Sequence, residues 1–437
     1  MADRRVGITG LGVVAPTALG AEDYWRSLLD GARAVKTVDL FDASGFDCTI
    51  GGQLDDFSAR KFVPKHYRKA VKVMARDIEI AVAAAELAFR DAGIRTRASE
   101  DGEVDVDPKR LGCNIGAGLI CTDLEELGQA VTTALVDGRL DLKAWGRGGM
   151  DNLTPLWLLK YLPNMLSCHV TIIHGAEGPS NCITCGDPSG ILAVGESTRL
   201  IAHGRADVVV AGGAESKLNP MGLLRQGLLR RLCVSRNDHP AEACRPFDAA
   251  HDGTVIGEGG GVLILEEIER ARQRGARIHA EIVGFGAAAD PTALDVLKPA
   301  AGGLSIAAGK ALADAGITAE QVDLLVAHGT GVPAEDRAEA DAWAAALGSA
   351  VDKPAAVALA GGLGSTFAGS GGIALATAAM ALNQGVVPGT VNFEKPADGV
   401  PLNLATEARQ REMTYALVGS FTVGGQAGAC VLKKCEA

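Results

Sequence analysis

Residues 178–216 read GPSNCITCGDPSGILAVGESTRLIAHGRADVVVAGGAES. The run VTIIHGAEGPSNCIT at 170–184 predicts a strand, followed by a tight turn and a buried helix that ends near His203 with Gly204 as its C-cap. A second apolar run, ADVVVAGGA, follows that helix. This order places the turn residue, Asp187, at the start of the helix.

Two interpretations of Asp187 stay open. The N-terminus of a helix, with its free N–H groups and positive dipole end, is the environment in which a cysteine becomes a reactive thiolate. Position 187 therefore suits a nucleophile. The alternative is structural, because Asp187 followed by Pro188 and Ser189 is typical of an N-cap with proline at the first helical position.

Composition limits the class of protein. The 437 residues are 47% hydrophobic and only 4% aromatic, with 56 glycines, which indicates a globular α/β protein with closely packed elements. The net charge of −11 argues against nucleic acid or a membrane surface as a general partner. No apolar run reaches the roughly 18 residues that cross a bilayer. We expect a cytoplasmic protein.

The ten cysteines follow no disulfide framework and are expected to be reduced thiols. Cys182 and Cys185 form a C-x-x-C, but no second pair lies at zinc spacing, so no metal is expected. The motif GITGLG lacks a suitably spaced ribose-binding acid, so no dinucleotide cofactor is expected either. The acidic pair Glu266 and Glu267 is interpreted as surface charge.

Internal repeats predict a duplicated fold. AFRDAGI at 88–94 recurs as ALADAGI at 311–317, each closing an Ala-rich helix, and VGITGLG at 6–12 recurs as EIVGFG at 281–286. No Pro-rich or Ser-rich linker separates the copies, so the halves, assigned to residues 1–258 and 259–437, should share one continuous core.

Over nearly its full length the chain resembles the elongating β-ketoacyl-acyl-carrier-protein synthases of the thiolase superfamily. The resemblance rests on VGITGLGVVAPTALG, CRPFDAAHDGTVIGEGGGVLILEE, VAHGTGVPAEDRAEA and VGSFTVGGQAGACVLKK, in that order. It implies a five-layered α/β/α/β/α thiolase-like fold. It also implies a dimer formed through an edge strand near HVTIIHG, residues 169–175.

Members of this family use a Cys-His-His set, in which the thiol takes the acyl chain and two imidazoles assist decarboxylation and stabilise the oxyanion. The resemblance places the nucleophile on Asp187, the first histidine on His328 and the second on Ser365. A supporting lysine falls on Ala360. One catalytic group of three is kept, so the chain is similar to the chain-length-factor class.

The resemblance also implies substrate contacts. Around His328 the pattern of Thr330, Asp336 and Glu339 is kept. Near the C-terminus GFGGTN becomes TVGGQA, which keeps Phe421 and Gly424 and replaces an aromatic gate with Val423. Cys185, two residues before Asp187, is a candidate substitute nucleophile.

Basic residues gather in KFVPKHYRKAVKVMAR at 61–76, which is either a solvated helix face or a docking surface for an acidic acyl carrier protein. The resemblance matches Lys72 and Arg231 to docking residues of the family, and Lys69 lies beside the first of these.

Three functions follow. The first is a non-condensing subunit of fatty-acid or polyketide assembly that pairs with an active synthase. The second is altered chemistry: a synthase using Cys185, a malonyl-carrier decarboxylase or an acyl hydrolase. The third is a stand-alone module that binds acyl chains or carriers. Both a homodimer and a heterodimer with an intact ketosynthase stay open.

Overall fold

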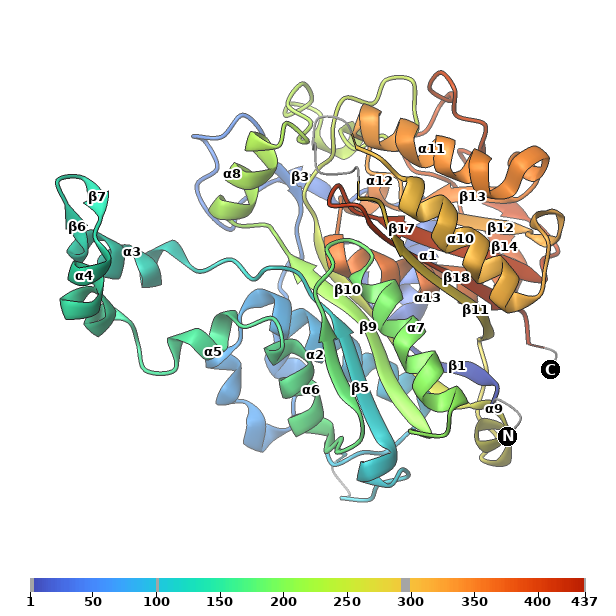
Figure 1. Cartoon of the computed structure of the whole chain (residues 1–437), viewed down its shortest axis with the longest axis horizontal. Coiled ribbons are helices and arrows are strands. Elements are labelled where there is room, and N and C mark those ends of the chain that lie inside the picture. Colours follow the sequence, from blue (N-terminus) through green and yellow to red (C-terminus); the bar gives the residue numbers. More distant parts are fainter. Residues whose placement is uncertain (1–3, 100–101, 292–298, 436–437) are drawn as a thin grey trace.

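The computed structural model describes residues 4–99, 102–291 and 299–435. Its centre is a mixed sheet in which two similar halves meet (Figure 1). The strands of the first half are β1 (Val6–Ala15), β5 (Leu111–Gly116), β8 (Ser180–Ile183), β9 (Val208–Ser216) and β10 (Glu258–Glu267). Those of the second are β11 (Ala280–Ala289), β12 (Leu324–Ala327), β13 (Ala355–Ala358), β15 (Asn403–Leu404), β17 (Tyr415–Phe421) and β18 (Gln426–Lys433).

Strand order repeats between the halves. The first half runs β8-β5-β9-β10-β1 and the second β13-β12-β17-β18-β11, with β15 added at the outer edge. In each half the outer three strands are parallel and the last two pair antiparallel. A short antiparallel pairing of β1 with β11 joins the two sheets at residues 6–8 and 280–282. The duplication predicted from the repeats is confirmed, with the sheets connected rather than separate.

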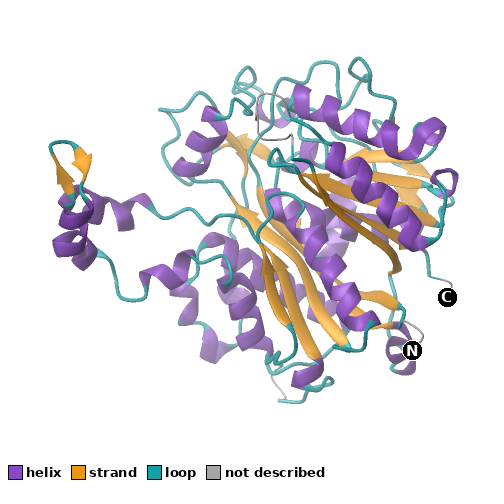
Figure 2. Ribbon diagram, viewed as in Figure 1, coloured by secondary structure: helices purple, strands orange, loops and turns teal. Residues whose placement is uncertain are grey.

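Helices cover the sheets in the order that five layers require (Figure 2). Two central helices, α7 (Ser189–Ala202) and α13 (Ser370–Gln384), contact strands of both halves. The outer face of the first half carries α2 (Arg76–Ala92) and α6 (Met165–His174), and that of the second carries α10 (Gly302–Ala315) and α11 (Pro333–Leu347). Three apolar clusters fill the spaces between these layers.

Smaller elements complete the chain. They include α1 (Ala21–Leu29), β2 (Ala18–Leu19), β3 (Val35–Thr37), β4 (Ile50–Gly52), α8 (Pro220–Leu228), α9 (Ile268–Gln273), α12 (Ala360–Leu363), β14 (Val386–Val387) and β16 (Arg409–Gln410). Residues 120–163 form a projecting arm that contains α3 (Leu124–Thr133), β6 (Leu135–Val136), β7 (Arg139–Leu140), α4 (Leu142–Ala144) and α5 (Trp157–Tyr161) (Figure 1). Among the described residues no helix is long and apolar enough to cross a lipid bilayer.

The repeated glycines explain why the two sequence copies look alike. A Cβ on Gly12 would lie 1.8 Å from the carbonyl oxygen of Ala84 in α2, and a Cβ on Gly286 would lie 2.0 Å from that of Ala307 in α10. Gly10 and Gly284 meet their helices equally closely, and both strands carry a bulge just before these glycines. The motif is therefore a helix-packing device, since only glycine lets a helix backbone approach a strand so closely.

The boundary between the two halves lies after β10, because β10 pairs with β1 and β9 of the first sheet. The chain crosses to the second half between Glu267 and Ala280, beyond the expected boundary at 258/259.

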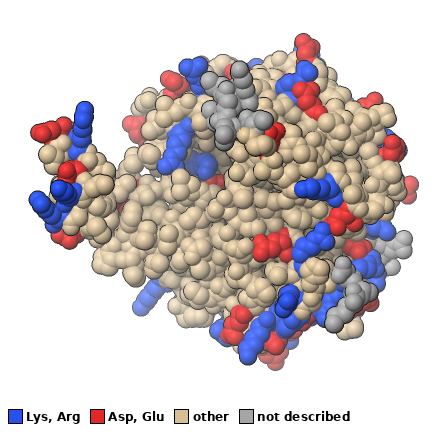
Figure 3. Space-filling model, viewed as in Figure 1, with Lys and Arg blue, Asp and Glu red and all other residues tan. Residues whose placement is uncertain are grey.

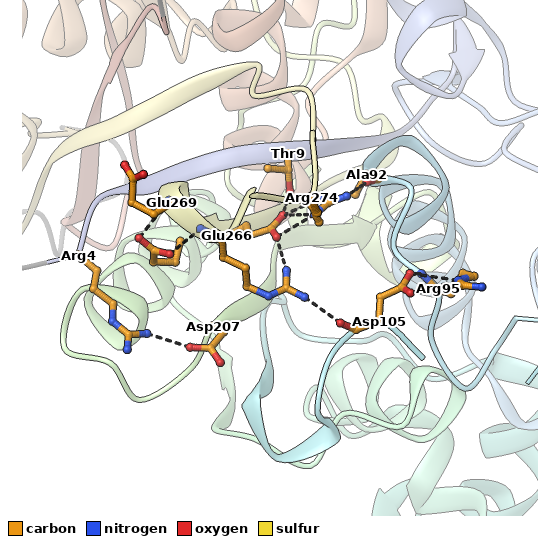
Figure 4. A network of polar contacts seen from close by, with 11 residues as sticks. Arg4, Thr9, Ala92, Arg95, Asp105, Asp207, Glu266, Glu269 and Arg274 are labelled. Carbon is orange, nitrogen blue, oxygen red and sulfur yellow. Dashed lines mark hydrogen bonds and ion pairs between the residues drawn. The ribbon is translucent and has the colours of Figure 1, made fainter. Parts of the chain in front are cut away.

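Near this crossing Glu266 is fully buried, which corrects its interpretation as a surface charge. Its carboxylate accepts hydrogen bonds from Thr9, Arg270 and Arg274, whose Nη2 lies 2.7 Å away (Figure 4). Arg274 also donates to the Ala92 carbonyl at the end of α2. The network ties the crossing to the first half.

The strand expected over 170–184 is wrong in its first part. Residues 165–174 form α6, with Leu166, Val170 and Ile173 on its buried side at the i, i+4, i+7 spacing of a helix. The helix ends at Gly175, which has a φ of 68°. The edge of the sheet is the short strand β8, and HVTIIHG lies outside the sheet.

Candidate functional site

The predicted strand–turn–helix unit is present. The chain leaves β8 at Ile183, turns through Gly186 with a φ of 72°, and enters α7 at Ser189. The Ser189 hydroxyl stabilises the turn by accepting the N–H of Cys185 at 2.8 Å and donating to the Gly186 carbonyl at 2.6 Å.

The expected N-cap role of Asp187 is wrong. Pro188 occupies the position before the helix, and no side chain in the described part of the chain caps α7. The Asp187 side chain is buried and lies instead against His328, with 3.5 Å between Oδ1 and Nε2. That distance is an ion-pair contact, long for a hydrogen bond.

Two buried carboxylates of α11 hold the loop that carries His328. The N–H groups of His328 and Gly329 donate to Glu339 at 2.7 and 2.8 Å. Those of Thr330 and Gly331 donate to Asp336 at 3.0 and 3.1 Å. The retained HGTG pattern is therefore a backbone cradle, which fixes the imidazole at the carboxyl end of β12.

The pKa values of Asp187 and His328 are shifted in opposite directions. Burial alone would raise the pKa of Asp187, but His328, with a smaller contribution from Arg231, lowers it to about 2. Burial would lower the pKa of His328, but the Asp187 carboxylate, with smaller contributions from Glu339 and Glu335, raises it. On its other side the imidazole Nδ1 lies 3.3 Å from the Ser420 hydroxyl, and the Phe421 ring packs edge-on at 5.8 Å. Both shifts favour an ionised aspartate beside a protonated imidazole.

Ser365 lies behind this pair. With Ala360, Thr330 and His328 it lines a small cavity of about 30 Å³. The Ser365 hydroxyl and His328 Nε2 are buried, and neither has a hydrogen-bond partner among the described residues. A cavity of this size has room for about one water molecule beside polar groups that need one. Ser365 thus shares a cavity with His328, which in turn contacts Asp187, and no second imidazole is among the residues that line this cavity.

A larger cavity of about 430 Å³, the front cavity, opens before Asp187. Its lining residues are Ala117, Gly118, Leu119, Pro163, Thr184, Gly186, Asp187, Glu215, Lys217, Gln226, Leu229, Arg231, Phe367, Thr422 and Val423. Val423 is among these residues, and its place as a gate stays a prediction. Gly424 is exposed and is not among the lining residues, and Phe421 is buried behind His328.

Arg231 does not lie on a docking surface. Its side chain is 6% exposed and forms a two-pronged ion pair with Glu335, at 2.6 and 2.9 Å. It also donates to Gln226 at 2.8 Å and faces the front cavity. Sequence reasoning missed Glu335, Gln226 and the ion pair of Glu215 with Lys217. The signal for the last was a lysine placed directly after the apolar strand that ends in GGAES.

Cys185 is poorly placed as a nucleophile. It is absent from the lining residues of the front cavity and of the small cavity beside His328. Burial raises the pKa of its thiol, the opposite of what activates a cysteine. Burial also raises the pKa of Cys182, to about 11. Within the described part of the chain no three His, Cys, Asp or Glu side chains form a group that could hold a metal ion.

The ion pair of Asp187 with His328 should make stability depend on pH. The raised pKa of His328 gives stability that is complete below about 6.5 and is lost as pH rises through the folded-state pKa. The lowered pKa of Asp187 gives stability that is complete above 3.8 and is lost as pH falls toward about 2. Asp187→Asn should therefore cost most between about pH 4 and 6.5 and progressively less above it.

Chemical denaturation of wild type and Asp187→Asn across pH 4 to 9 measures this difference. A difference in unfolding free energy that stays constant over that range would show that the two side chains are not paired as charges.

The duplicated fold, the elbow before α7 and the histidine at the end of β12 define a condensing-enzyme scaffold of the thiolase superfamily. The sequence matches "Beta-ketoacyl synthase, N-terminal domain" over residues 3–271 and "Beta-ketoacyl synthase, C-terminal domain" over residues 279–394. The chain belongs to the β-ketoacyl synthase family.

The chain is similar to known proteins over nearly their full length. The "3-oxoacyl-[acyl-carrier-protein] synthase 2" of Vibrio harveyi is 33% identical, with 99% of each chain covered. A solved structure, "The ishigamide ketosynthase/chain length factor", superposes with a TM-score of 0.82 at 26% identity, with all of both chains covered. Another, "AntDE:AntF (apo): type II PKS acyl-carrier protein in complex with its ketosynthase bound to the hexaketide", gives a TM-score of 0.81 at 25% identity, covering 99% of this chain and 100% of that one.

Proposed function

We propose that this chain is a non-condensing, chain-length-factor-like subunit of fatty-acid or polyketide assembly, which pairs with an active β-ketoacyl synthase. The observation that carries the proposal is the buried Asp187, ionised and paired with His328 at 3.5 Å, where the family's nucleophile belongs. Transfer of an acyl group from a thioester to a carboxylate gives a reactive anhydride, whereas transfer to a thiolate gives another thioester.

The second catalytic histidine of the family is also missing, because Ser365 occupies its position. The Ser365 hydroxyl cannot change its charge near neutral pH and cannot take over the proton work of an imidazole. The scaffold around it is intact, because the glycines and buried carboxylates that shape the site keep their contacts. Loss confined to the reacting groups suits a subunit that shapes a substrate channel for its partner. The relatives named above support fatty-acid or polyketide assembly as the setting. The cytoplasm is the location that we propose.

A second candidate function is decarboxylation or hydrolysis of a carrier-bound acyl group. It is favoured by His328, a buried imidazole with a raised pKa at the edge of the site. A protonated imidazole can stabilise the enolate that decarboxylation produces. This function predicts release of carbon dioxide from malonyl carrier by the isolated chain, and loss of that release in His328→Ala.

For the partner subunit we propose contact through the free outer edge of β8. In the described chain β8 pairs only with β5, and its two outermost residues, Ser180 and Asn181, are exposed. Figure 3 shows few charged side chains over β5, α6 and α7. Near this edge α6 exposes Ile172. The projecting arm exposes further large apolar side chains, namely Leu142, Met150, Leu156 and Leu158. An unpaired edge beside exposed apolar side chains is typical of an interface.

Native mass spectrometry tests the pairing. The chain is mixed with a β-ketoacyl synthase that keeps Cys-His-His, taken from the same source. A one-to-one complex whose condensation activity requires this chain is the expected result. A homodimer that ignores the synthase, together with unchanged activity, would favour the stand-alone module instead.

For acyl carrier protein we propose docking on a basic surface formed by five exposed residues: Lys61, Lys65, Arg68, Lys69 and Lys72. They lie on short 3₁₀ turns rather than on the continuous helix face that was the alternative. Arg76, the last basic residue of the segment, is only partly exposed and pairs with the buried Glu258.

Charge reversal tests this docking surface. Lys69→Glu with Lys72→Glu should weaken binding of the acidic carrier about tenfold at low salt, and less at high salt, because exposed charges are screened. Fluorescence anisotropy with labelled carrier measures the affinity. Lys109→Glu with Lys395→Glu, at two other exposed sites, makes the same change in net charge and should leave binding nearly unchanged. Equal losses in both double variants would contradict a local docking site.

A further inference from the structure

The wall of the front cavity is mostly apolar but carries several polar side chains. Lys217, Gln226 and Arg231 all line it, alongside Asp187. Apolar residues such as Leu119, Leu229 and Val423 make up the rest. The cavity therefore offers N–H donors close to the place where a thioester would lie.

Lys217 is held at the cavity wall by its surroundings. Its ammonium contacts the Glu215 carboxylate and lies 5.1 Å from the centre of the Phe367 ring. Glu215 is fully buried and is fixed in turn, since its Oε2 accepts the N–H of Ala368 at 2.9 Å. A Cβ on Gly118 would overlap the Glu215 carboxylate, so glycine leaves room for it. The side chain of Lys217 stays 18% exposed.

An ammonium carries three N–H bonds, and Glu215 is the one hydrogen-bond acceptor found for Lys217 among the described residues. The remaining donors are available to a ligand in the cavity that Lys217 lines. Gln226 adds to them. Its Oε1 accepts from Arg231 at 2.8 Å, which leaves the amide N–H₂ as the free end of the side chain.

Both cations are already neutralised. Glu215 pairs with Lys217, and Glu335 pairs with Arg231. The cavity thus presents N–H donors without an excess of positive charge, and Asp187 adds a negative charge to it. This combination suits a neutral carbonyl oxygen better than a carboxylate. A saturated alkyl chain would leave these donors without water and without an acceptor, which is unfavourable.

We propose that the front cavity takes an acyl chain with carbonyl oxygens near its thioester end, a 3-oxoacyl chain, in preference to a saturated chain of the same length. Lys217 is the specificity-determining residue, with Gln226 as a second donor. The inference rests on the proposed function in that it assumes a carrier-borne acyl chain as the ligand, and it names the chemical class of that chain.

Calorimetry on the isolated chain tests the preference. The ligands are non-hydrolysable pantetheine amides of octanoic and 3-oxooctanoic acids. Wild type should bind the 3-oxo ligand about tenfold more tightly, as one added hydrogen bond allows. Glu215→Gln with Lys217→Met removes both partners of the ion pair while keeping an acceptor for Ala368. It should reduce the preference to about twofold, by weakening binding of the 3-oxo ligand.

Lys109→Met, at an exposed site, is the matched control and should keep the full preference. Gln226→Met serves as a second variant should the double variant fail to fold, and it should also narrow the preference. Equal or tighter binding of the octanoyl ligand by wild type would overturn the proposal, as would an unchanged preference in the folded variants or no binding of either ligand. The partner subunit takes no part in this measurement, so its outcome is independent of the pairing test.

Discussion

Asp187→Cys should turn a chain that takes no acyl group at position 187 into one that is acylated close to stoichiometrically there. The new thiol would lie just before the N-terminus of α7 and beside His328, whose imidazole is 3.5 Å from the present carboxylate. Both features stabilise a thiolate. Exchange of an acyl group between two thioesters is nearly balanced in energy, so the carrier can donate its chain directly.

Intact-mass analysis and peptide mapping after incubation with acyl carrier protein measure this change. Asp187→Asn, which has nearly the same shape but no thiol, is the control and should stay unmodified. Little condensation product should form, because Ser365 still replaces the second histidine. Rapid condensation by Asp187→Cys alone would show that Ser365 is not a deficit, and an unreactive but folded variant would show that the elbow is no longer a competent site.

Asp336→Ala should lower the free energy of unfolding by about 4 kcal/mol. The Asp336 carboxylate is fully buried and accepts from the backbone N–H groups of Phe247, Thr330 and Gly331, with the His251 ring at 2.9 Å. Alanine would leave all of these donors buried without an acceptor. Urea denaturation followed by circular dichroism measures the change.

The same helix provides the control for this prediction. Asp341 in α11 pairs with Arg337 at the surface, where both side chains are more than half exposed. Asp341→Ala should cost under about 1 kcal/mol, as exposed ion pairs usually do. Similar costs for both variants would show that the cradle under His328 contributes little to stability.

Much of the fold could be predicted because the two sequence copies keep the residues that packing requires. Gly10 with Gly12 and Gly284 with Gly286 are visible as a repeat, and each pair is the contact point between a strand and its covering helix. The αL glycines Gly93 and Gly316, which close α2 and α10, repeat for the same reason. These are local requirements, so the sequence shows them directly.

Side-chain direction could not be predicted in the same way. An aspartate before Pro188 suits an N-cap equally well in any helix, and the position of His328, 141 residues further along the chain, decides where the carboxylate points. The sequence-based prediction for Arg231 is wrong for a similar reason. An arginine is usually a surface residue, but here Glu335, from a distant helix, pairs with it in the interior. HVTIIHG is as apolar as a strand, and only the spacing of its buried residues marks it as part of a helix.

The most direct test of the central claim is the intact mass of the wild-type chain after incubation with acyl-loaded and malonyl-loaded carrier protein, with Asp187→Cys as the positive control. We expect no adduct on Asp187 or Cys185 and no carbon dioxide from malonyl carrier, while the control variant gains one acyl group. A stable acyl group mapped to Cys185 of the wild type, or steady release of carbon dioxide, would contradict the claim and make this chain an enzyme in its own right.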